Sequence, residues 1–407
     1  MINIDFLFLM EHEDREGAAL YNITERLSKK GYYCVILSTE FHSHRYGQYN
    51  PKCIVFPYSI DDKTWPVSFF RNKKWRESQL VSLNWEQLLS NANKEFKKPK
   101  SDVIKSFFKH LAWDESFKDF LCSSGVRPTN VEVIGNPLHE LLFHETLNSS
   151  DLTASLKKEF AIPHQADIYF FPMNYGWAFS SDKTIKAKIK MGYDENIAWQ
   201  YRDYSKRCLN KFVKFITKAA IVNTTDYFII RPHPSISIEQ YELIFKQLKL
   251  DIPKNILITK SYSIKEWISV AKLIGSSWST SVWDSIKIGK IGFLFTPEPR
   301  PEWLNTFWNN KVTNLSSVEE FMVLTQEKGI DKESPIGIID EIVDWLISNI
   351  GGDHYTTFTP LNKSQWLYSL RSRFREFSMK HLNASFINKG MQRDYFKPIN
   401  TKEHTDV

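Results

Sequence analysis

Short apolar runs alternate with segments of helical periodicity along most of the chain, and this alternation restricts the fold more than any other feature. Residues 2–10 form a nearly continuous apolar run, which is typical of a strand buried on both faces. Residues 17–30 then place Leu20 and Leu27 at helical spacing, and Gly31 follows where a helix can end. Strands that alternate with helices predict mostly parallel sheets covered by helices on both sides.

The pattern predicts two such α/β units. Strands are expected at 2–10, 33–38, 53–56, 80–83 and 131–134, and then at 168–171, 227–231, 255–259, 272–275 and 291–295. Helices are expected at 17–30, 103–111, 196–220, 237–248, 264–271, 280–288 and within 336–382. The 407 residues suffice for two domains, and a polar, turn-prone segment at 147–151 separates them. We predict a Rossmann-like domain at 1–150, a second at 151–345 facing it across a cleft, and a C-terminal helix with a basic tail at 346–407.

The composition excludes several classes of protein. The four cysteines lie far apart without a C-x-x-C pair, which argues against a disulfide scaffold or a compact zinc module and favours a reducing cytoplasm. No apolar run approaches the roughly 20 residues of a membrane-spanning helix, and the N-terminus lacks the layout of a signal peptide. The sequence therefore predicts a cytoplasmic protein.

The positive charge is concentrated at the C-terminus. Residues 361–407 hold nine Lys and Arg against four Asp and Glu, which accounts for +5 of the net charge of +6. Because the basic residues do not spread over the fold, a nucleic-acid partner is not expected. The helix within 336–382 combines Trp366 and Phe374 with several arginines. It could pack its apolar side onto the domains, the interpretation we favour, or dock on an anionic membrane surface at the inner face of the cytoplasmic membrane.

Three strand ends in the second half carry more than turn residues. Arg231-Pro-His-Pro-Ser235 follows one predicted strand, and its prolines fix the backbone so that a guanidinium and an imidazole can meet a phosphate. Residues 275–281 bring five hydroxyls to the start of a helix, where free N–H groups and the helix dipole favour an anion. Asp284 lies one turn into that helix, and Asn174 lies in a loop after a third strand. Such strand ends are where ligands bind in open α/β sheets.

The signatures of other nucleotide and hydrolase chemistries are missing. The sequence contains no G-x-G-x-x-G, no G-x-x-x-x-G-K-[ST] and no G-x-S-x-G, so dinucleotide oxidoreductase, P-loop NTPase and α/β-hydrolase functions lack their motifs. The acidic and histidine group at 11–14 lacks H-E-x-x-H spacing, and we expect no metal site there.

These residues, in this order, resemble the surface carbohydrate biosynthesis family of bacterial glycosyltransferases. The resemblance extends over most of the chain. Its motifs are Glu11-x-x-x-Arg15-Glu16, Leu83-Asn-Trp-Glu86-Gln87, His110-Leu-Ala-Trp113-Asp114, Gly125-Val126, Ile134-Gly-Asn136-Pro137, Asn174-Tyr-Gly-Trp177, Arg231-Pro-His-Pro-Ser235 and Ser276–Asp284. The sequence departs from the family at Asp114, where glycine is usual, at Leu138, where arginine is usual, and at Asp284, where glutamate is usual.

The resemblance implies a GT-B fold, with the acceptor mainly on the first domain, a nucleotide sugar on the second, and C-terminal helices that cross back. The His-Pro motif is similar to that of capsular Kdo transferases and polysialyltransferases, which makes CMP-Kdo, or a related CMP-ulosonic acid, the preferred donor. The acceptor would be a surface polysaccharide or a lipid-linked glycan, as in capsule or lipopolysaccharide synthesis. No metal or other cofactor is expected.

The resemblance also implies roles for particular residues. Arg231 and His233 would hold the α-phosphate, Asp284 would bind the ribose, and the remaining donor contacts would come from Asn174, Ser235, Ser276, Ser277 and Thr280. The first domain must supply a carboxylate as a base or nucleophile. Its candidates are Glu11, Glu16, Glu86 and Asp114, with Glu140 in reserve.

Two other functions fit the same sequence. The first keeps the fold and changes the donor to a UDP-, GDP- or CDP-linked group, including transfer of a polyol phosphate. The second is a non-catalytic module of a polysaccharide-assembly complex that uses the basic C-terminal helix.

Overall fold

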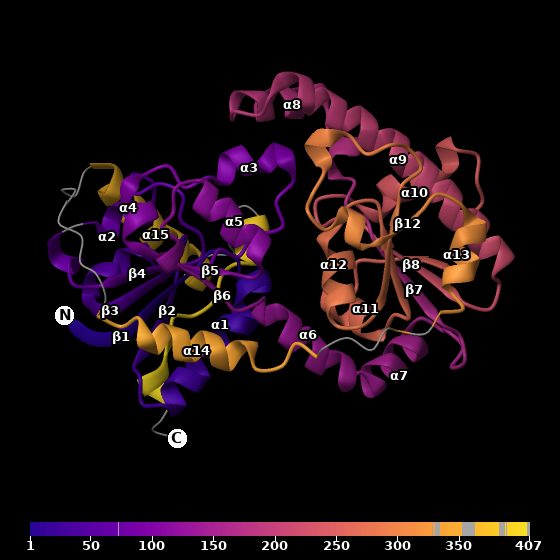
Figure 1. The fold of residues 1–407 in the computed structure, drawn as a ribbon. Helices are drawn as coiled ribbons and strands as arrows, with labels where there is room; N and C mark the ends of the chain where they lie inside the picture. The colour runs from indigo at the N-terminus through magenta and orange to yellow at the C-terminus, as the bar shows by residue number, and fades with distance from the viewer. Residues whose placement is uncertain are drawn as a thin grey trace. The chain divides into compact units, whose positions relative to one another are not determined.

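The computed structural model describes residues 1–71, 73–327, 329, 334–351, 363–381, 387 and 389–404. Its contacts divide the chain into two compact units (Figure 1). Unit 1 comprises Met1–Leu89, Asn93–Leu138 and Ile336–Val407, and unit 2 comprises Ser90–Ala92 and His139–Pro335. The chain thus leaves unit 1 at residue 138 rather than 150 and returns at 336 rather than 345. The exit is earlier because helix α6 (Pro137–Leu147), which ends before residue 150, belongs to unit 2 from His139 onward.

Unit 1 is built on a seven-stranded sheet with the order β13-β2-β1-β3-β4-β5-β6. Every neighbouring pair is parallel except β13 with β2, where the tail of the chain adds a short antiparallel edge. The strands are β1 (Ile2–Met10), β2 (Cys34–Ser38), β3 (Tyr49–Phe56), β4 (Gln79–Ser82), β5 (Phe108–Ala112), β6 (Val131–Val133) and β13 (Ile399–Asn400). Because β2 and β3 flank β1 on opposite sides, the strand order reverses at β1, and loops after β1 and β3 diverge there.

The helices of unit 1 pack on this sheet or on other helices of the unit. They are α1 (Glu13–Lys29), α2 (Val67–Phe70), α4 (Asp102–Ser106), α5 (Glu115–Ser123), α14 (Ile338–Ser348), α15 (Lys363–His381) and α16 (Lys389–Gln392), and α3 (Asn91–Lys97) begins in unit 2 and ends in unit 1. Helix α1 ends as the glycine predicts, since Gly31 adopts a φ of 89°, a left-handed conformation that suits glycine. Apolar side chains of β1, β2 and β3 form the core with α2 and α4.

Unit 2 holds a six-stranded, fully parallel sheet with the order β12-β11-β10-β7-β8-β9. Its strands are β7 (Ile168–Pro172), β8 (Tyr227–Arg231), β9 (Ile256–Ile258), β10 (Leu273–Ser276), β11 (Ile291–Phe295) and β12 (Thr313–Leu315). The chain moves outward from β7 to β8 and β9, and then returns to β10 on the other side of β7. The strand order therefore reverses between β7 and β10, the position at which α/β sheets bind ligands.

Helices cover both faces of the second sheet (Figure 1). They are α7 (Ser150–Glu159), α8 (Asp182–Lys190), α9 (Glu195–Val222), α10 (Ile238–Gln247), α11 (Ile264–Val270), α12 (Thr280–Lys287) and α13 (Val318–Leu324). The long helix α9 supplies much of the core, where Phe212 and Phe215 stack on Phe295 with ring centroids 5.1 and 4.5 Å apart. The two parallel-sheet α/β units confirm the predicted fold class.

Two predictions of local structure are wrong. The segment 103–111 is not one helix, because α4 ends at Ser106 and the next residues form β5 between β4 and β6. Pairing with two neighbours overrides the helical spacing of its apolar residues. The favoured packing of the C-terminal helix is also wrong: α15 attaches to unit 1 by its polar side and leaves Trp366 and Phe374 exposed. Part of the predicted helix, residues 352–362, lies outside the described residues.

Candidate functional site

The candidate donor site of unit 2 lies where β7, β8 and β10 end. Parallel strands place their carboxyl ends at one edge of the sheet, and these three strands are adjacent, with β7 in the middle. The loop after β8 and the loop after β10 leave strands about 10 Å apart, since neighbouring strands are about 4.8 Å apart. All three strand ends singled out in the sequence therefore meet at one edge.

The loops after β7 and β10 are bound to each other. Ser276 Oγ donates to the carbonyl of Pro172 at 3.0 Å, and the indole N–H of Trp278 donates to the carbonyl of Asn174 at 3.0 Å. Gly275 allows the close packing beneath them, because a Cβ there would meet the ring of Phe293 at 2.3 Å. These contacts hold the start of α12 beside the loop that carries the exposed Asn174.

Ser276 and Ser277 are buried, and their hydroxyls have partners inside unit 2. Ser277 Oγ donates to the carbonyl of Phe295 at 2.9 Å and lies 2.6 Å from the hydroxyl of Tyr175, which can donate to it. The crowding of hydroxyls in the sequence therefore reflects in part the fixing of the loop. Ser279 caps α12 by accepting from the N–H of Ser281, and Thr280 is exposed at the first position of the helix.

The turn after β8 presents His233 and Ser235 on the surface. The backbone N–H of Ser235 donates to Nδ1 of His233 at 3.3 Å, and the Ser235 hydroxyl lies 2.8 Å from the same nitrogen. A backbone N–H can only donate, so Nδ1 accepts and the proton of the neutral ring is on Nε2. Partial burial and the charge of Lys260 lower the pKa of His233, which favours this neutral form. The turn therefore offers an Nε2–H donor.

The side chain of Arg231, at the start of the same turn, holds two loops together. Its Nε and Nη2 donate to the carbonyl of Tyr262 at 3.1 and 2.7 Å, which ties β8 to the loop after β9. Asp284 is held as well, since its Oδ1 lies 3.0 Å from Nε2 of His139 at the start of unit 2. The side chain of Asp284 remains partly exposed.

Two cations at this edge were not singled out in the sequence. Arg300, in the proline-rich segment after β11, donates to the carbonyl of Ser277 at 3.3 Å, and burial lowers its pKa. Lys260 donates to the carbonyl of Pro234 at 3.0 Å in the turn that bears His233. The sequence could have indicated Arg300 because it lies in the segment that follows the predicted strand 291–295. Both residues add positive charge at the edge where an anion is expected.

In unit 1 the structure brings together three of the four predicted catalytic carboxylates around Arg15. The guanidinium of Arg15 lies 2.7 Å from Oε1 of Glu16, 2.5 Å from Oε1 of Glu86 and 3.7 Å from Oε2 of Glu11. Glu11 and Glu16 follow β1, and Glu86 follows β4, so the cluster lies at the carboxyl edge of the sheet. Arg15, quoted in the sequence only as part of a motif, is its centre.

Glu16 and Glu86 have little capacity left for a substrate. Glu16 is fully buried, and its second oxygen accepts the backbone N–H of Glu11 at 3.0 Å. Burial raises the pKa of Glu16, although Arg15 acts in the opposite direction. Burial also raises the pKa of Glu86, but Lys97 and Arg15 outweigh it and hold the pKa below its ordinary value. These two carboxylates position Arg15 and the chain after β1, whereas Glu11 stays half exposed.

His12, which the sequence suggested only as a member of a possible metal-binding group, joins this edge. Nδ1 of His12, the residue before α1, lies 3.2 Å from Oδ2 of Asp394, and its Nε2 lies 3.8 Å from Oε1 of Glu11. A carboxylate on Nδ1 holds the proton there and leaves Nε2 as the acceptor, which is the arrangement of a general base. No local motif could reveal this pair, because its members are 382 residues apart.

The other reserve carboxylates lie apart from this cluster. Asp114 caps α5 after β5, where its side chain accepts the N–H of Phe117 at 3.0 Å. This contact is ordinary helix capping. Glu140 is buried in α6 and belongs to unit 2. Within the ranges that the structure describes, no group of three His, Cys, Asp or Glu side chains is arranged to hold a metal ion.

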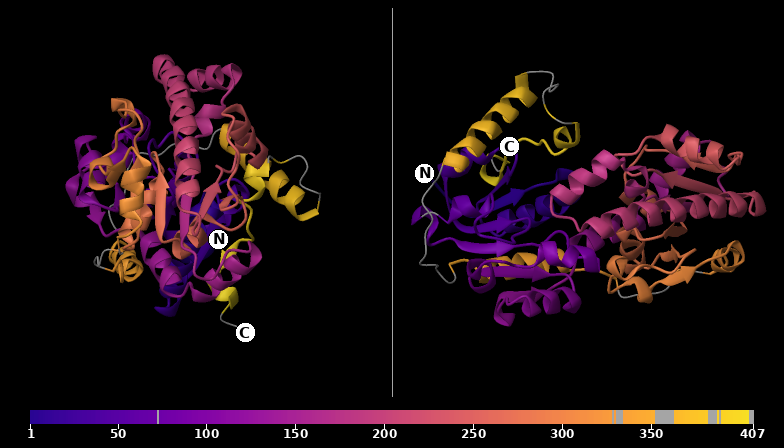
Figure 2. Two further views of the ribbon diagram at one scale, coloured as in Figure 1. Left: turned by 90° about the vertical axis from the view of Figure 1, so that its right-hand side faces the viewer. Right: turned by 90° about the horizontal axis from the view of Figure 1, so that it is seen from above.

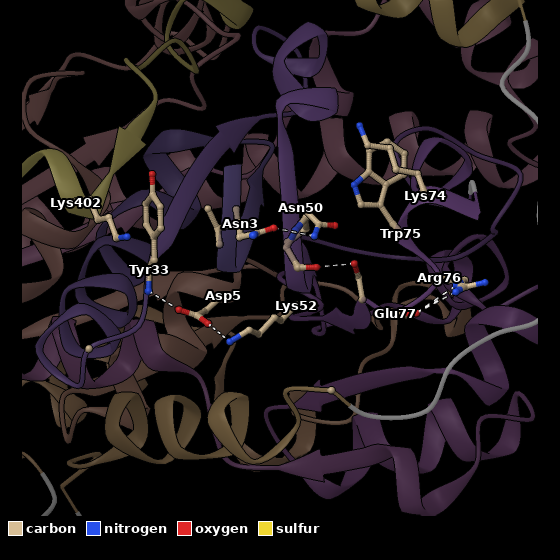
Figure 3. Close-up of a pocket in the computed structure, with 15 residues that line it drawn as sticks. Asn3, Asp5, Tyr33, Asn50, Lys52, Lys74, Trp75, Arg76, Glu77 and Lys402 are labelled. Atoms are coloured by element: carbon tan, nitrogen blue, oxygen red, sulfur yellow. Dashed lines mark hydrogen bonds and ion pairs between the residues drawn. The ribbon is translucent and has the colours of Figure 1, made fainter. Parts of the chain in front are cut away.

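A polar pocket of about 1040 Å³ lies at the opposite, amino edge of the unit 1 sheet (Figure 3). It contains residues at the starts of strands, and four of its charged side chains form two ion pairs: Asp5 with Lys52 at 2.8 Å, and Arg76 with Glu77 at 3.3 Å. None of the predicted site residues lines it. We therefore place the candidate sites at the carboxyl edges of the sheets.

Comparisons with known proteins identify the fold. No family model and no curated protein matches the sequence. Among solved structures, the chain is similar to a putative UDP-N-acetylglucosamine 2-epimerase from Listeria monocytogenes, with a TM-score of 0.58 and 8% identity over 88% of this chain and 100% of that one. It is also similar to UDP-GlcNAc 2-epimerase from Neisseria meningitidis bound to UDP-GlcNAc, with a TM-score of 0.55 and 14% identity over 86% and 100% of the two chains.

A lower similarity links the chain to the wall teichoic acid polymerase TagF, with a TM-score of 0.48 and 10% identity over 93% of this chain and 90% of that one. At identities this low, the similarities show the fold alone. The fold is of the GT-B class, as predicted. None of these three proteins is described as using Kdo.

Proposed function

We propose that the protein is a glycosyltransferase that moves a sugar from a nucleotide-activated donor to a hydroxyl of a bacterial surface polysaccharide or glycolipid. One observation carries the proposal: adjacent strands β8, β7 and β10 bring His233, Asn174 and the exposed start of α12 to a single edge, at the reversal of strand order. This edge offers N–H donors and positive charge, the chemistry that a phosphate requires.

In this mechanism, the Nε2–H of His233 and the N–H groups at the start of α12 donate to the phosphate next to the sugar. They stabilise the negative charge that grows as the nucleotide leaves. Arg300 and Lys260 add a positive field, while Asp284, fixed by His139, binds the ribose through its other oxygen. Ser276, Ser277 and Arg231 act mainly by holding the loops. The preferred donor remains CMP-Kdo or a related CMP-ulosonic acid, on the resemblance of the His-Pro motif.

His12 then takes the role first assigned to a carboxylate. Nε2 of His12 accepts the proton of the acceptor hydroxyl, Asp394 orients the ring, and Glu11 stabilises the resulting imidazolium. Glu16 and Glu86 are positioning residues in this scheme, because Arg15, Lys97 and the backbone occupy their oxygens.

The donor is tested by thermal unfolding of the full chain with CMP, CDP, UDP and GDP, followed by transfer from CMP-Kdo. A nucleotide at about 100 times its Kd stabilises a protein by about 2.7 kcal/mol, and we expect this from CMP. His233→Ala should lower transfer by about 100-fold, the usual effect of removing one such donor, while His164→Ala, at an exposed histidine elsewhere in unit 2, should not.

Other outcomes would redirect the proposal. Stabilisation by UDP or CDP alone favours the alternative donors, including polyol-phosphate transfer. Conversion of UDP-GlcNAc without any acceptor would show that the protein is an epimerase and not a transferase. Epimerase is the activity named for two proteins of similar fold. Nucleotide binding without turnover would favour a non-catalytic assembly module.

The base is tested separately. His12→Ala should lower kcat by about 100-fold or more while nucleotide binding to unit 2 stays unchanged. Asp394→Asn should lower kcat less and alter its pH profile, because the ring loses its orienting carboxylate. His144→Ala, at an exposed histidine in α6, is the matched control. An undiminished kcat in His12→Ala would return the role of base to Glu11, for which Glu11→Gln is the decisive variant.

A further inference from the structure

Helix α15 is amphipathic, but its orientation is the reverse of that expected for a helix of a protein surface. Its polar side is buried against unit 1: Ser372 and Glu376 are 1% and 4% exposed. The hydroxyl of Ser372 accepts the backbone N–H of His44 at 3.1 Å. Glu376 accepts from Arg45 at 2.7 Å and lies 3.1 Å from Nε2 of His44, in the short helix Ser43–Gln48. These polar contacts, together with the ring of Tyr368 stacked on Trp65 at 4.8 Å, fix which side of α15 faces outward.

The outward side is apolar. Trp366, Leu370, Phe374 and Phe377 are 64%, 51%, 56% and 52% exposed, and their spacing of four, four and three residues puts them in one stripe along α15. Figure 2 shows the backbone of α15 in yellow. Leu367 lies beside the stripe and is also exposed. Large side chains of this kind each gain about 1.5–3 kcal/mol when removed from water. Such a contiguous patch marks a surface that binds something.

The charges beside the stripe are positive. Arg371 and Arg373 are exposed next to it, and the one acidic residue of the helix, Glu376, faces inward and is matched by Arg45 and Lys380. Arg375 pairs with Glu40 of unit 1. The outward side thus combines aromatic rings and cations with no acidic side chain.

An apolar groove of about 840 Å³ adjoins the stripe. Leu370, Phe374 and Phe377 form one part of it, and Ile387 and Met391 form another. Three arginines, Arg371, Arg373 and Arg375, also line it. Hydrocarbon-sized apolar space with cations alongside suits an acyl chain and its phosphate head group.

We propose that α15 lies in the interface of an anionic membrane, with its aromatic stripe among the head groups and acyl chains and its arginines on lipid phosphates. The pattern of apolar face and basic flanks is that of an interfacial helix. A second copy of the chain fits less well, because a two-fold contact would bring the arginines of one patch onto those of the other. No helix among the residues described is long and apolar enough to cross a bilayer, so the contact is peripheral at this helix. This attachment does not depend on the proposed chemistry.

Flotation of the full chain with vesicles of phosphatidylcholine, with and without phosphatidylglycerol, tests the proposal. We expect binding to the vesicles that contain phosphatidylglycerol. The triple variant Leu370→Gln, Phe374→Gln, Phe377→Gln should lose it. Arg371→Gln with Arg373→Gln should weaken it by about 30-fold, since each cation near an anionic surface contributes about fivefold. All these side chains are exposed, so the variants should fold as the parent does.

The matched control replaces exposed apolar residues elsewhere, with Ile221→Gln, Val222→Gln and Val323→Gln in unit 2. This control should bind vesicles as the parent does, and the α15 variants should keep the nucleotide-induced stabilisation of the parent. The proposal is wrong if the parent ignores phosphatidylglycerol vesicles or if the triple variant still binds them. It is also wrong if light scattering shows that the parent is a dimer and the triple variant a monomer. The same holds if the stripe binds an acidic protein but no vesicle.

Discussion

Helices α14 and α15 both belong to the C-terminal part of the chain that returns to unit 1, yet they present opposite sides to it. Helix α14 buries Ile339, Ile342, Val343 and Leu346 completely as it packs on α1. Its acidic residues face outward, where Asp340 pairs with Arg26 at 2.7 Å. Helix α15 buries Ser372 and Glu376 instead and exposes its aromatic stripe.

The difference shows what amphipathic periodicity can and cannot specify. The spacing of apolar residues predicts that a helix has an apolar side, but not what covers it. In α14 the partner is an apolar surface of unit 1, whereas α15 meets the polar helix Ser43–Gln48 and satisfies its hydrogen bonds. The buried side chains of Ser372 and Glu376 both have hydrogen-bond partners, and this pairing makes the second orientation possible.

Truncation of an apolar residue in each helix, buried in α14 and exposed in α15, should give the largest contrast. Leu346→Ala in α14 removes a completely buried side chain and should lower the free energy of unfolding by about 2–5 kcal/mol. Phe374→Ala in α15 removes a larger but exposed side chain and should change it by no more than about 0.5 kcal/mol. Urea denaturation of both variants measures the difference. Equal losses would mean that the stripe is covered within the protein itself.

Glu376 should give a smaller effect that depends on pH. Burial raises the pKa of Glu376, but Lys380 and Arg45 outweigh it and hold the pKa below its ordinary value of 4.5. A carboxylate whose pKa is lower in the folded than in the unfolded protein stabilises the folded state at pH above the unfolded pKa. This contribution disappears as the pH falls through the folded pKa. Glu376→Gln should therefore cost about 1–3 kcal/mol at neutral pH and progressively less below pH 4.5.

Denaturation of the parent and of Glu376→Gln at several pH values provides the measurement. Glu25→Gln is the matched control, because Glu25 forms an exposed pair with Lys29 on α1 and should cost less than about 0.5 kcal/mol. His44, next to Glu376, has a pKa lowered by burial, and burial also lowers the pKa of nearby His42, to about 3, so both histidines titrate in acid beside this contact. A loss in Glu376→Gln that stays constant down to acidic pH would show that the ion pairs do not hold α15.

The candidate donor site of unit 2 shows the same difference between what a local pattern can predict and what it cannot. The three loops of unit 2 could be predicted because each follows an apolar run, and the carboxyl ends of parallel strands share an edge. The hydrogen-bond partners of the side chains in these loops could not be predicted. Ser276 and Ser277 turned out to bind carbonyls of neighbouring strands, and Asp284 to bind His139, since only the fold brings these partners within reach.

The sequence by itself determined the two α/β units, most of their strands and the positions of the functional loops, because periodicity and turn residues act over a few neighbouring residues. Tertiary structure alone decided the pairing of His12 with Asp394, the grouping of Glu11, Glu16 and Glu86 around Arg15, and the outward side of α15. Each of these includes at least one contact between residues far apart in the chain, as Glu86 is from Arg15. Such contacts are selected by the packing of the whole unit, and no local pattern encodes them.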